Sequence, residues 1–121
     1  MKYSVLFYTK ENGERPVCNY LDSLPVKPRA KLVGMIKILE DVGRNLREPY
    51  SKYLEDGIFE LRSIFGNDIS RLLYFFEKGG KIIIVSGFTK KQNKTPRSEI
   101  ELAKKRREDY FKREGERNAK I

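Results

Sequence analysis

Residues 58–88 read IFELRSIFGNDISRLLYFFEKGGKIIIVSGF, and their pattern predicts the central part of the fold. Its three apolar segments follow the two-residue period of a β-strand, and they cover residues 58–65, 69–76 and 82–88. They are separated by two turn-forming sequences, Gly66-Asn67 and Lys78-Gly79-Gly80. We therefore expect two consecutive hairpins, which together form an antiparallel β-meander.

The sequence before the meander predicts one more strand and two helices. Residues 2–8 alternate as a first strand. Pro16 opens a short helix that Pro25 ends, and Pro28 then starts a longer helix. The spacing of the apolar residues in the longer helix places them in one stripe, made of Leu32, Met35, Ile36, Leu39, Val42 and Leu46.

A third helix is expected after the meander. Thr95-Pro96 is typical of an N-cap followed by a first-turn proline, and the helix it opens passes into a polar tail after about residue 111. We therefore predict a single domain over residues 1–121, of the α+β class. The predicted order is β-α-α-β-β-β-α, with the sheet packed against a helical hairpin and a C-terminal helix.

The composition limits the compartment. No apolar run approaches the roughly 20 residues needed to cross a bilayer, and the N-terminus lacks the long apolar region of a secretory signal. The single cysteine, Cys18, permits no internal disulfide, which agrees with a reducing compartment. We expect a cytoplasmic protein without a membrane partner.

The chain has no histidine, and this excludes several classes of enzyme. Ser-His-Asp and Cys-His hydrolases, zinc sites with histidine ligands and histidine-based ribonucleases are all ruled out. Any enzyme here must work with Lys, Arg, Tyr, Asp or Glu. The 26 Lys and Arg residues against 17 Asp and Glu give a net charge of +9, which favours phosphate backbones or an acidic protein as partner.

The first hairpin predicts a pair of arginines. If Gly66-Asn67 is a two-residue turn, Arg62 lies directly opposite Arg71. If the second turn has two or four residues, the same pairing pattern continues into the third strand. The face that carries the arginines then also carries Glu60, Leu73, Phe75, Ile84, Ser86, Phe88 and Lys90. The opposite face, expected to pack on the helices, carries Phe59, Leu61, Phe65, Leu72, Tyr74, Phe76, Ile83 and Val85.

Like charges directly opposite each other destabilise a sheet, so this pair suggests a site built for an anion. A surface ion network of Glu60 with the two arginines explains the spacing equally well. Three lysines in residues 90–96 stand just before a helix N-terminus, where phosphate is favoured, and Lys52 with Tyr53 extends the site into a basic groove with an aromatic surface. The basic run Lys104–Arg107 is explained as well by a solvated helix face as by a binding role.

Four segments resemble the phage-derived HigB-type toxins of the RelE/ParE superfamily. They are residues 53–62, 71–75, 86–96 and 99–104. The most specific element is the pattern Phe-x-Lys-Lys-x-x-Lys-Thr-Pro at residues 88–96, followed by a helix that opens Glu-Ile-Glu-x-Ala. The resemblance covers essentially the whole domain, and the predicted helical hairpin and meander agree with the fold of that family.

The resemblance implies the toxin of a type II toxin-antitoxin system. Such a toxin is a ribosome-dependent endoribonuclease, an mRNA interferase, which cuts mRNA and arrests translation. The implied partners are mRNA, the ribosome with its rRNA, and a cognate antitoxin whose helix-turn-helix domain is the only link to operator DNA. Attack of the RNA 2′-hydroxyl on its own phosphate needs no cofactor and no metal, so we expect neither.

The resemblance also suggests roles for individual residues. Arg71 and the pair Lys90 and Lys91 match phosphate-handling basic positions of the superfamily, and Arg62 adds charge stabilisation. The general base is either Glu60 or a lysine, and Lys91 is a candidate acid. The candidate RNA- and ribosome-binding residues are Lys52, Tyr53, Lys94, Arg97, Lys104, Lys105, Arg106 and Arg107.

Two other readings stay open. The superfamily also contains ParE-like toxins that bind and inhibit DNA gyrase without cleaving nucleic acid. A phage accessory protein that only binds nucleic acid is the third possibility, because kinship of fold does not determine activity.

Overall fold

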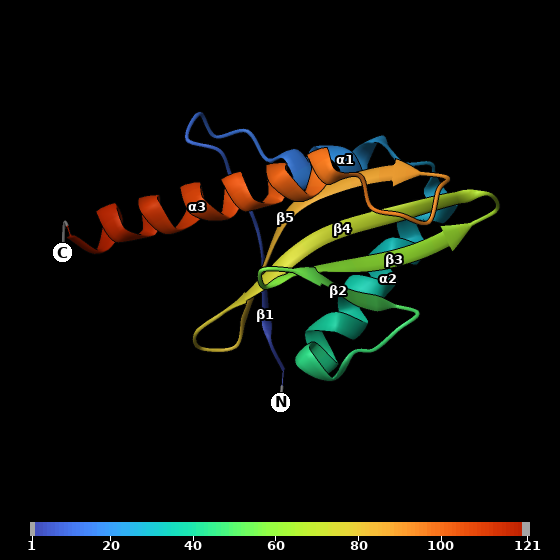
Figure 1. Cartoon of the computed structure of the whole chain (residues 1–121), viewed down its shortest axis with the longest axis horizontal. Coiled ribbons are helices and arrows are strands. Elements are labelled where there is room, and N and C mark those ends of the chain that lie inside the picture. The colour runs from blue at the N-terminus through green and yellow to red at the C-terminus, as the bar shows by residue number, and fades with distance from the viewer. Residues whose placement is uncertain (1, 120–121) are drawn as a thin grey trace.

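The computed structural model describes residues 2–119 and contains a five-stranded sheet with helices on both faces (Figure 1). In chain order the elements are β1 (Ser4–Phe7), α1 (Pro16–Ser23), α2 (Val26–Val42), a 3₁₀ turn η1 (Gly43–Asn45), β2 (Ser51–Glu55), β3 (Ile58–Phe65), β4 (Asp68–Glu77), β5 (Lys81–Lys90) and α3 (Arg97–Ala119). The strand order is β1-β5-β4-β3-β2. Strands β2 to β5 are antiparallel, and β1 joins β5 in parallel.

The predicted α+β class with a meander and a C-terminal helix is confirmed, but strand β2 was not predicted. It is an edge strand of five residues that pairs only with β3, with a register shift between Tyr53 and Glu55. So short a segment has too few alternating positions to show a two-residue period. Its pairing therefore depends on β3 and not on a pattern of its own.

Three helix boundaries differ from the prediction. Helix α2 ends at Val42, so Leu46, expected in its apolar stripe, follows the 3₁₀ turn η1. Helix α2 begins at Val26, before Pro28, because a proline is tolerated throughout the first turn of a helix. Helix α3 continues to Ala119, where a polar tail was expected from about residue 111. Ion pairs at helical spacing, Arg113 with Asp109 and Arg117 with Glu114, support this charged segment.

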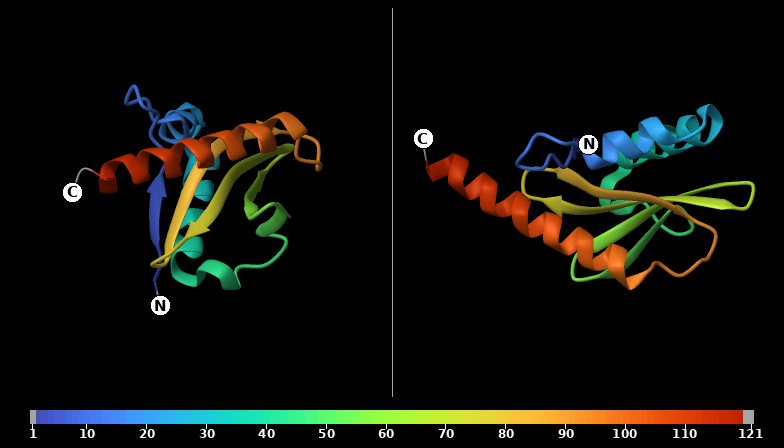
Figure 2. Two further views of the ribbon diagram at one scale, coloured as in Figure 1. Left: turned by 60° about the vertical axis from the view of Figure 1, so that its left-hand side comes forward. Right: turned by 90° about the horizontal axis from the view of Figure 1, so that it is seen from above.

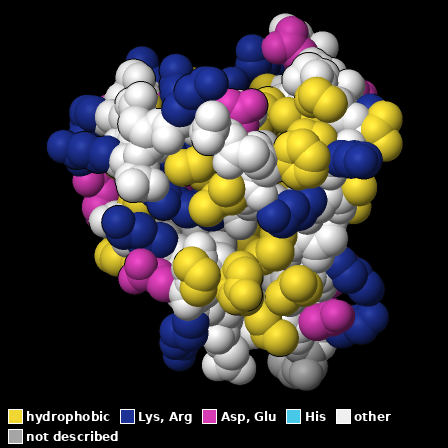
Figure 3. Space-filling view, turned by 90° about the vertical axis from the view of Figure 1, so that its right-hand side faces the viewer, with side chains coloured by type: hydrophobic (Ala, Val, Ile, Leu, Met, Phe, Trp, Pro, Cys, Tyr) yellow, Lys and Arg dark blue, Asp and Glu magenta, His cyan; other side chains and the backbone are white. Residues whose placement is uncertain are grey.

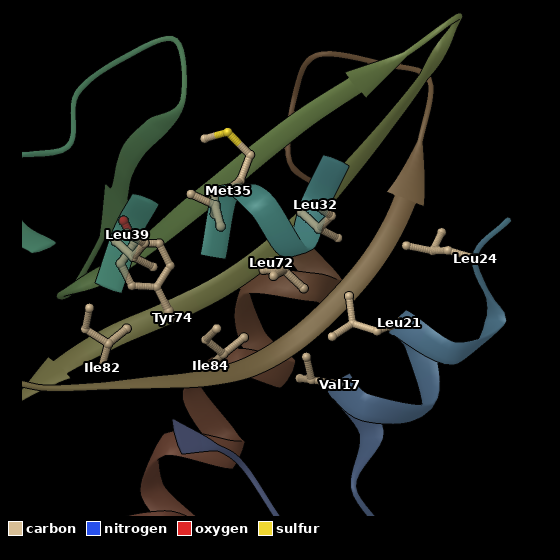
Figure 4. Packing of buried hydrophobic residues seen from close by; sticks show 11 residues of the cluster. Val17, Leu21, Leu24, Leu32, Met35, Leu39, Leu72, Tyr74, Ile82 and Ile84 are labelled. Atoms are coloured by element: carbon tan, nitrogen blue, oxygen red, sulfur yellow. The ribbon is translucent and has the colours of Figure 1, made fainter. Parts of the chain in front are cut away.

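The two faces of the sheet carry different helices. Figure 2 shows α1 and α2 on one side and α3 on the other. Helix α1 lies over β5 and helix α2 over β3. The core between them and the sheet is apolar, and Figure 4 shows leucines of both helices above the central strands. Its fully buried members include Val17, Leu32, Leu39, Leu61, Leu72, Ile82 and Ile84.

Helix α3 covers the opposite face only in part. Its buried residues are Ile100 and Ala103, and farther along the helix Tyr110 still packs on Phe75 of β4. Only the C-terminal end of the helix extends past the sheet (Figure 1). The apolar cluster under α3 consists of Tyr8, Ile58, Leu73, Phe75, Ile83, Val85, Phe88 and Ala103. No helix within residues 2–119 has the length and hydrophobicity that crossing a membrane requires.

The predicted faces of β5 are wrong at one end of the strand. Ile84 packs on the α1–α2 face, and Ile83 and Val85 pack under α3, which is the reverse of the expectation. The turn between β4 and β5 has three residues, because Glu77 pairs with Lys81, and this shifts the register by one.

A β-bulge at Val85 shifts the register back, so that Leu73 pairs with Ser86 and Arg71 with Phe88. The predicted face is therefore correct from Ser86 onward, where the candidate site lies.

Candidate functional site

Arg62 and Arg71 are direct cross-strand partners on β3 and β4, as the turn arithmetic predicted. Their side chains lie on the sheet face that carries α3. Gly66-Asn67 forms the expected two-residue turn, with Phe65 opposite Asp68, and this sets the register of the whole hairpin. Two long central strands therefore hold the guanidinium groups side by side.

The carboxylate of Glu60 lies between the two arginines and is completely buried. Its Oε1 accepts a hydrogen bond from Nε of Arg62 at 2.5 Å. Its Oε2 accepts one from the Thr95 hydroxyl at 2.5 Å and lies 3.6 Å from Nη1 of Arg71. Both carboxylate oxygens are occupied by donors, so this geometry makes Glu60 a group that positions the arginines.

Arg71 is also completely buried. Its Nη1 donates to the backbone carbonyl of Asn93 at 3.0 Å, and its guanidinium carbon lies 5.9 Å from the centre of the Phe88 ring. Burial lowers the pKa of Arg71, against the opposing effect of the Glu60 carboxylate, but an arginine stays protonated at neutral pH. Two guanidinium groups and one carboxylate leave one unbalanced positive charge inside the site.

The segment between β5 and α3 covers this pair. The carbonyl oxygen of Asn93 accepts hydrogen bonds from both Arg62 and Arg71. Thr95, predicted as an N-cap, uses its hydroxyl to donate to Glu60. Three hydrogen bonds thus connect this segment to the buried charges.

A cleft of about 420 Å³ opens beside Arg62, between β2, β3 and the start of α3. It is large enough for a nucleotide-sized ligand. Tyr53 is half exposed, with its ring 5.1 Å from that of Phe59. The cleft brings together four residues of the predicted groove with apolar and polar neighbours, and its lining is Lys52, Tyr53, Leu54, Arg62, Asn93, Lys94, Thr95 and Ile100.

Lys90 and Lys91 lie outside the buried cluster, at the end of β5. Both are exposed, and the side chain of Lys91 keeps 76% of its surface accessible, with Nζ 3.9 Å from a carboxylate oxygen of Asp68. Seen from the end of the molecule that carries the β3–β4 turn, lysine and arginine side chains surround exposed hydrophobic ones (Figure 3). Neither Lys90 nor Lys91 lines the cleft.

The predicted RNA-binding residues of α3 have other contacts. Arg97 binds both carboxylate oxygens of Glu55, and Lys104 approaches the same carboxylate at 2.5 Å. These two cations lower the pKa of Glu55 to about 2. Arg107 donates to the backbone carbonyl of Asp56.

Arg106 is half buried and donates to the carbonyl of Val85 at 2.9 Å and to the Ser86 hydroxyl at 3.2 Å, so it holds the β5 bulge. Burial lowers its pKa. Within residues 2–119, Lys105 is the one member of the run Lys104–Arg107 that has no hydrogen-bond or ion-pair partner. The structure does not bring these residues into the cleft.

Sequence reasoning missed three residues of this region. Asn93 acts through its backbone, and Thr95 and Glu55 act through partners far away in the chain. The one sequence signal for such a partner was the predicted position of Glu60 on the face of the two arginines. A buried carboxylate there needs a hydrogen-bond donor for each of its oxygens, and Thr95 is one of these donors. Over the described residues, no group of three acidic or cysteine side chains is placed to hold a metal ion.

Comparison with protein families gives a match. The family model described as "Phage derived protein Gp49-like (DUF891)" matches residues 19–108. The matched segment contains Glu60, both arginines and the whole segment 90–96. No curated protein matches the chain.

Proposed function

The chain belongs to the phage-derived Gp49-like family, a RelE/HigB-type toxin family, and we propose that it is the toxin of a type II toxin-antitoxin system. Its activity in this proposal is that of a HigB-like, ribosome-dependent endoribonuclease that cleaves mRNA and arrests translation. The sheet with a helix pair on one face and α3 on the other supports a RelE-like topology.

The pairing of Arg62 with Arg71 over the single carboxylate of Glu60 is the observation that carries this proposal. One positive charge in the cluster has no counterion, and the adjoining cleft adds Lys52, Tyr53 and Lys94. A phosphodiester supplies the missing negative charge, and the nucleobase next to it contacts the aromatic and apolar side chains of the cleft.

In the proposed reaction the 2′-hydroxyl of one nucleotide attacks its own 3′-phosphate. The bond from phosphorus to the 5′-oxygen breaks, which leaves a cyclic phosphate and a 5′-hydroxyl. Arg62 and Arg71 stabilise the negative charge that develops on the phosphorane oxygens. The base removes the 2′-proton, and the acid gives a proton to the departing oxygen.

We assign these two proton transfers to lysines of this region, because both oxygens of Glu60 already accept hydrogen bonds. Lys90 and Lys91 are exposed at the end of β5, and Lys52 and Lys94 line the cleft. The ribosome contributes by ordering the mRNA, since positioning alone lowers a barrier by several kcal/mol. The proposed antitoxin, with its helix-turn-helix domain, silences the toxin and connects it to operator DNA.

Induced expression of the chain tests the proposal. We expect growth and translation to stop, primer extension to show new 5′ ends in translated mRNA, and co-expression of the neighbouring antitoxin gene to reverse the arrest. Strong expression that leaves growth and mRNA intact contradicts the toxin assignment. Growth arrest with intact mRNA and inhibited gyrase supports the ParE-like alternative.

A further inference from the structure

The two guanidinium groups of the site converge on one neutral oxygen atom. Nη2 of Arg62 and Nη1 of Arg71 both donate to the backbone carbonyl of Asn93. A carbonyl oxygen carries only a partial negative charge. An ionised oxygen in the same place forms shorter and stronger hydrogen bonds with the same two donors.

Arg71 has further donors that the carbonyl does not reach. Among residues 2–119, its Nε and Nη2 are the buried side-chain nitrogen and oxygen atoms without a hydrogen-bond partner. Buried polar groups in folded proteins are nearly always hydrogen-bonded, so each exception calls for an explanation. A tetrahedral oxyanion offers several acceptor oxygens, whereas the Asn93 carbonyl offers one.

Apart from the two hydrogen bonds to the Asn93 carbonyl, the segment that supplies it is exposed and held by few contacts. Asn93 and Lys94 are exposed, and the nearest anchor on the β5 side is the loose pair of Lys91 with Asp68 at 3.9 Å. On the α3 side, Thr95 is buried and bonded to Glu60. Residues 91–94 can therefore move while Thr95 and α3 stay in place.

We propose that the Asn93 carbonyl occupies the position of a ligand oxygen in an oxyanion site, and that segment 91–94 is a cover which a bound oxyanion displaces. The ligand class is a compact tetrahedral oxyanion, either free phosphate or the phosphodiester of RNA. Only binding of the RNA phosphodiester rests on the proposed function. Displacement exposes Arg71, which the covered site keeps out of contact with solvent.

Titration of the free protein with inorganic phosphate, followed by NMR of chain labelled with ¹³C and ¹⁵N, tests the proposal. We expect saturable upfield movement of the Asn93 carbonyl ¹³C resonance, because that carbonyl loses two hydrogen bonds. The amide signals of Asn93 and Lys94 move with the same saturation. Sodium chloride at equal ionic strength leaves all three signals in place.

Two variants provide the matched comparison. Arg62→Gln removes one of the two guanidinium groups that donate to the Asn93 carbonyl, at a position that is largely buried. We expect this variant to bind phosphate about tenfold more weakly or worse. Arg47→Gln removes an equal charge from an exposed arginine whose contacts are local backbone carbonyls, and it leaves the binding constant unchanged. Thermal melts of both variants confirm that they are folded.

Three outcomes overturn the proposal. They are the absence of saturable binding, saturation without movement of the Asn93 carbonyl, and equal weakening by Arg62→Gln and Arg47→Gln. The titration contains no RNA and no ribosome, so it is independent of cleavage. Phosphate binding with a moving Asn93 carbonyl, in a protein that cleaves no mRNA, upholds the oxyanion site and rejects the nuclease. A second experiment, with the same toxin and an mRNA substrate in a translating extract, distinguishes the RNA phosphodiester from free phosphate as the ligand.

Discussion

Two groups of basic side chains in this protein differ in how their charge is balanced. In the first, Arg62 and Arg71 share one buried carboxylate, Glu60, inside the fold. In the second, most basic residues of α3 pair with Glu55 at the end of β2, with Asp56 after it or with acidic residues of α3 itself, or donate to backbone carbonyls. A run of basic residues in the sequence therefore does not by itself locate a binding surface.

The two groups also differ in dielectric environment. The carboxylate of Glu60 and the guanidinium of Arg71 have no exposed surface, so removal of either partner leaves the other charge desolvated. Glu55 and Arg97 keep one third or more of their side-chain surface exposed, and water and salt screen their interaction. We therefore expect substitutions in the first group to have the larger effects.

Glu60→Ala has the largest expected effect on stability. It leaves Arg62 and Arg71 facing each other without a counterion and lowers the free energy of unfolding by about 3–5 kcal/mol. Urea denaturation followed by circular dichroism measures the change. Glu55→Ala is the matched substitution in the second group and destabilises the protein less, so equal losses for the two variants would remove the distinction between the groups.

Arg106→Ala has the next largest effect. It leaves the carbonyl of Val85 in the β5 bulge without its donor and lowers the free energy of unfolding by about 1–3 kcal/mol. The same denaturation experiment tests this, with Lys105→Ala as the neighbouring control. A stability equal to that of the wild type would show that Arg106 is not needed to hold the bulge.

The Glu55 cluster predicts a smaller, pH-dependent effect. Hydrogen bonds and charge from Arg97 and Lys104 lower the pKa of Glu55 from 4.5 to about 2. A lowered carboxyl pKa contributes stability that is complete above the ordinary pKa and is lost as the pH falls from 4.5 towards 2.

Glu55→Gln removes this contribution. We expect the melting temperature of the variant to lie below that of the wild type at pH 7 and the difference to shrink as the pH falls through the same range. Scanning calorimetry at a series of pH values measures it. A difference that is independent of pH would mean that the ion pairs of Glu55 do not contribute.

Lys105→Gln has the smallest expected effect. Lys105 is exposed and has no partner within residues 2–119, so its replacement changes the free energy of unfolding by less than about 0.5 kcal/mol. If the chain binds RNA as proposed, we expect this one charge to contribute only through the general field of the molecule. The salt dependence of RNA binding should therefore become slightly shallower for the variant. A loss of stability as large as that of Arg106→Ala would instead show that Lys105 helps to hold the fold.

The central hairpin and its arginine pair were predictable from the sequence because Gly66-Asn67 is a two-residue turn, and this sets the register by local rules. The bulge at Val85 was not predictable, since the Val85 carbonyl accepts its hydrogen bond from Arg106, which lies on a helix distant in the sequence. Strand β2 is too short to show a period, and its pairing depends on β3.

In the candidate site, the cluster of Glu60 with Arg62 and Arg71 was predictable from the sequence, but its burial was not. The parity of the strands placed Glu60, Arg62 and Arg71 on one face. The burial of Glu60 and Arg71 depends on the backbone of residues 93–95, whose conformation follows from contacts with those same charges. Local sequence patterns carry no information about such a cover.

The sharpest test of the proposed role of the arginine pair is cleavage of mRNA by the Arg71→Lys variant in a translating extract. The variant keeps the positive charge but loses the planar fork of donors, and we expect it to cleave about 10²-fold more slowly than the wild type. Arg47→Lys, the same substitution at an exposed site away from the cleft, serves as the control and keeps wild-type cleavage, and thermal melts show that both variants are folded. Wild-type cleavage by a folded Arg71→Lys protein would contradict the account.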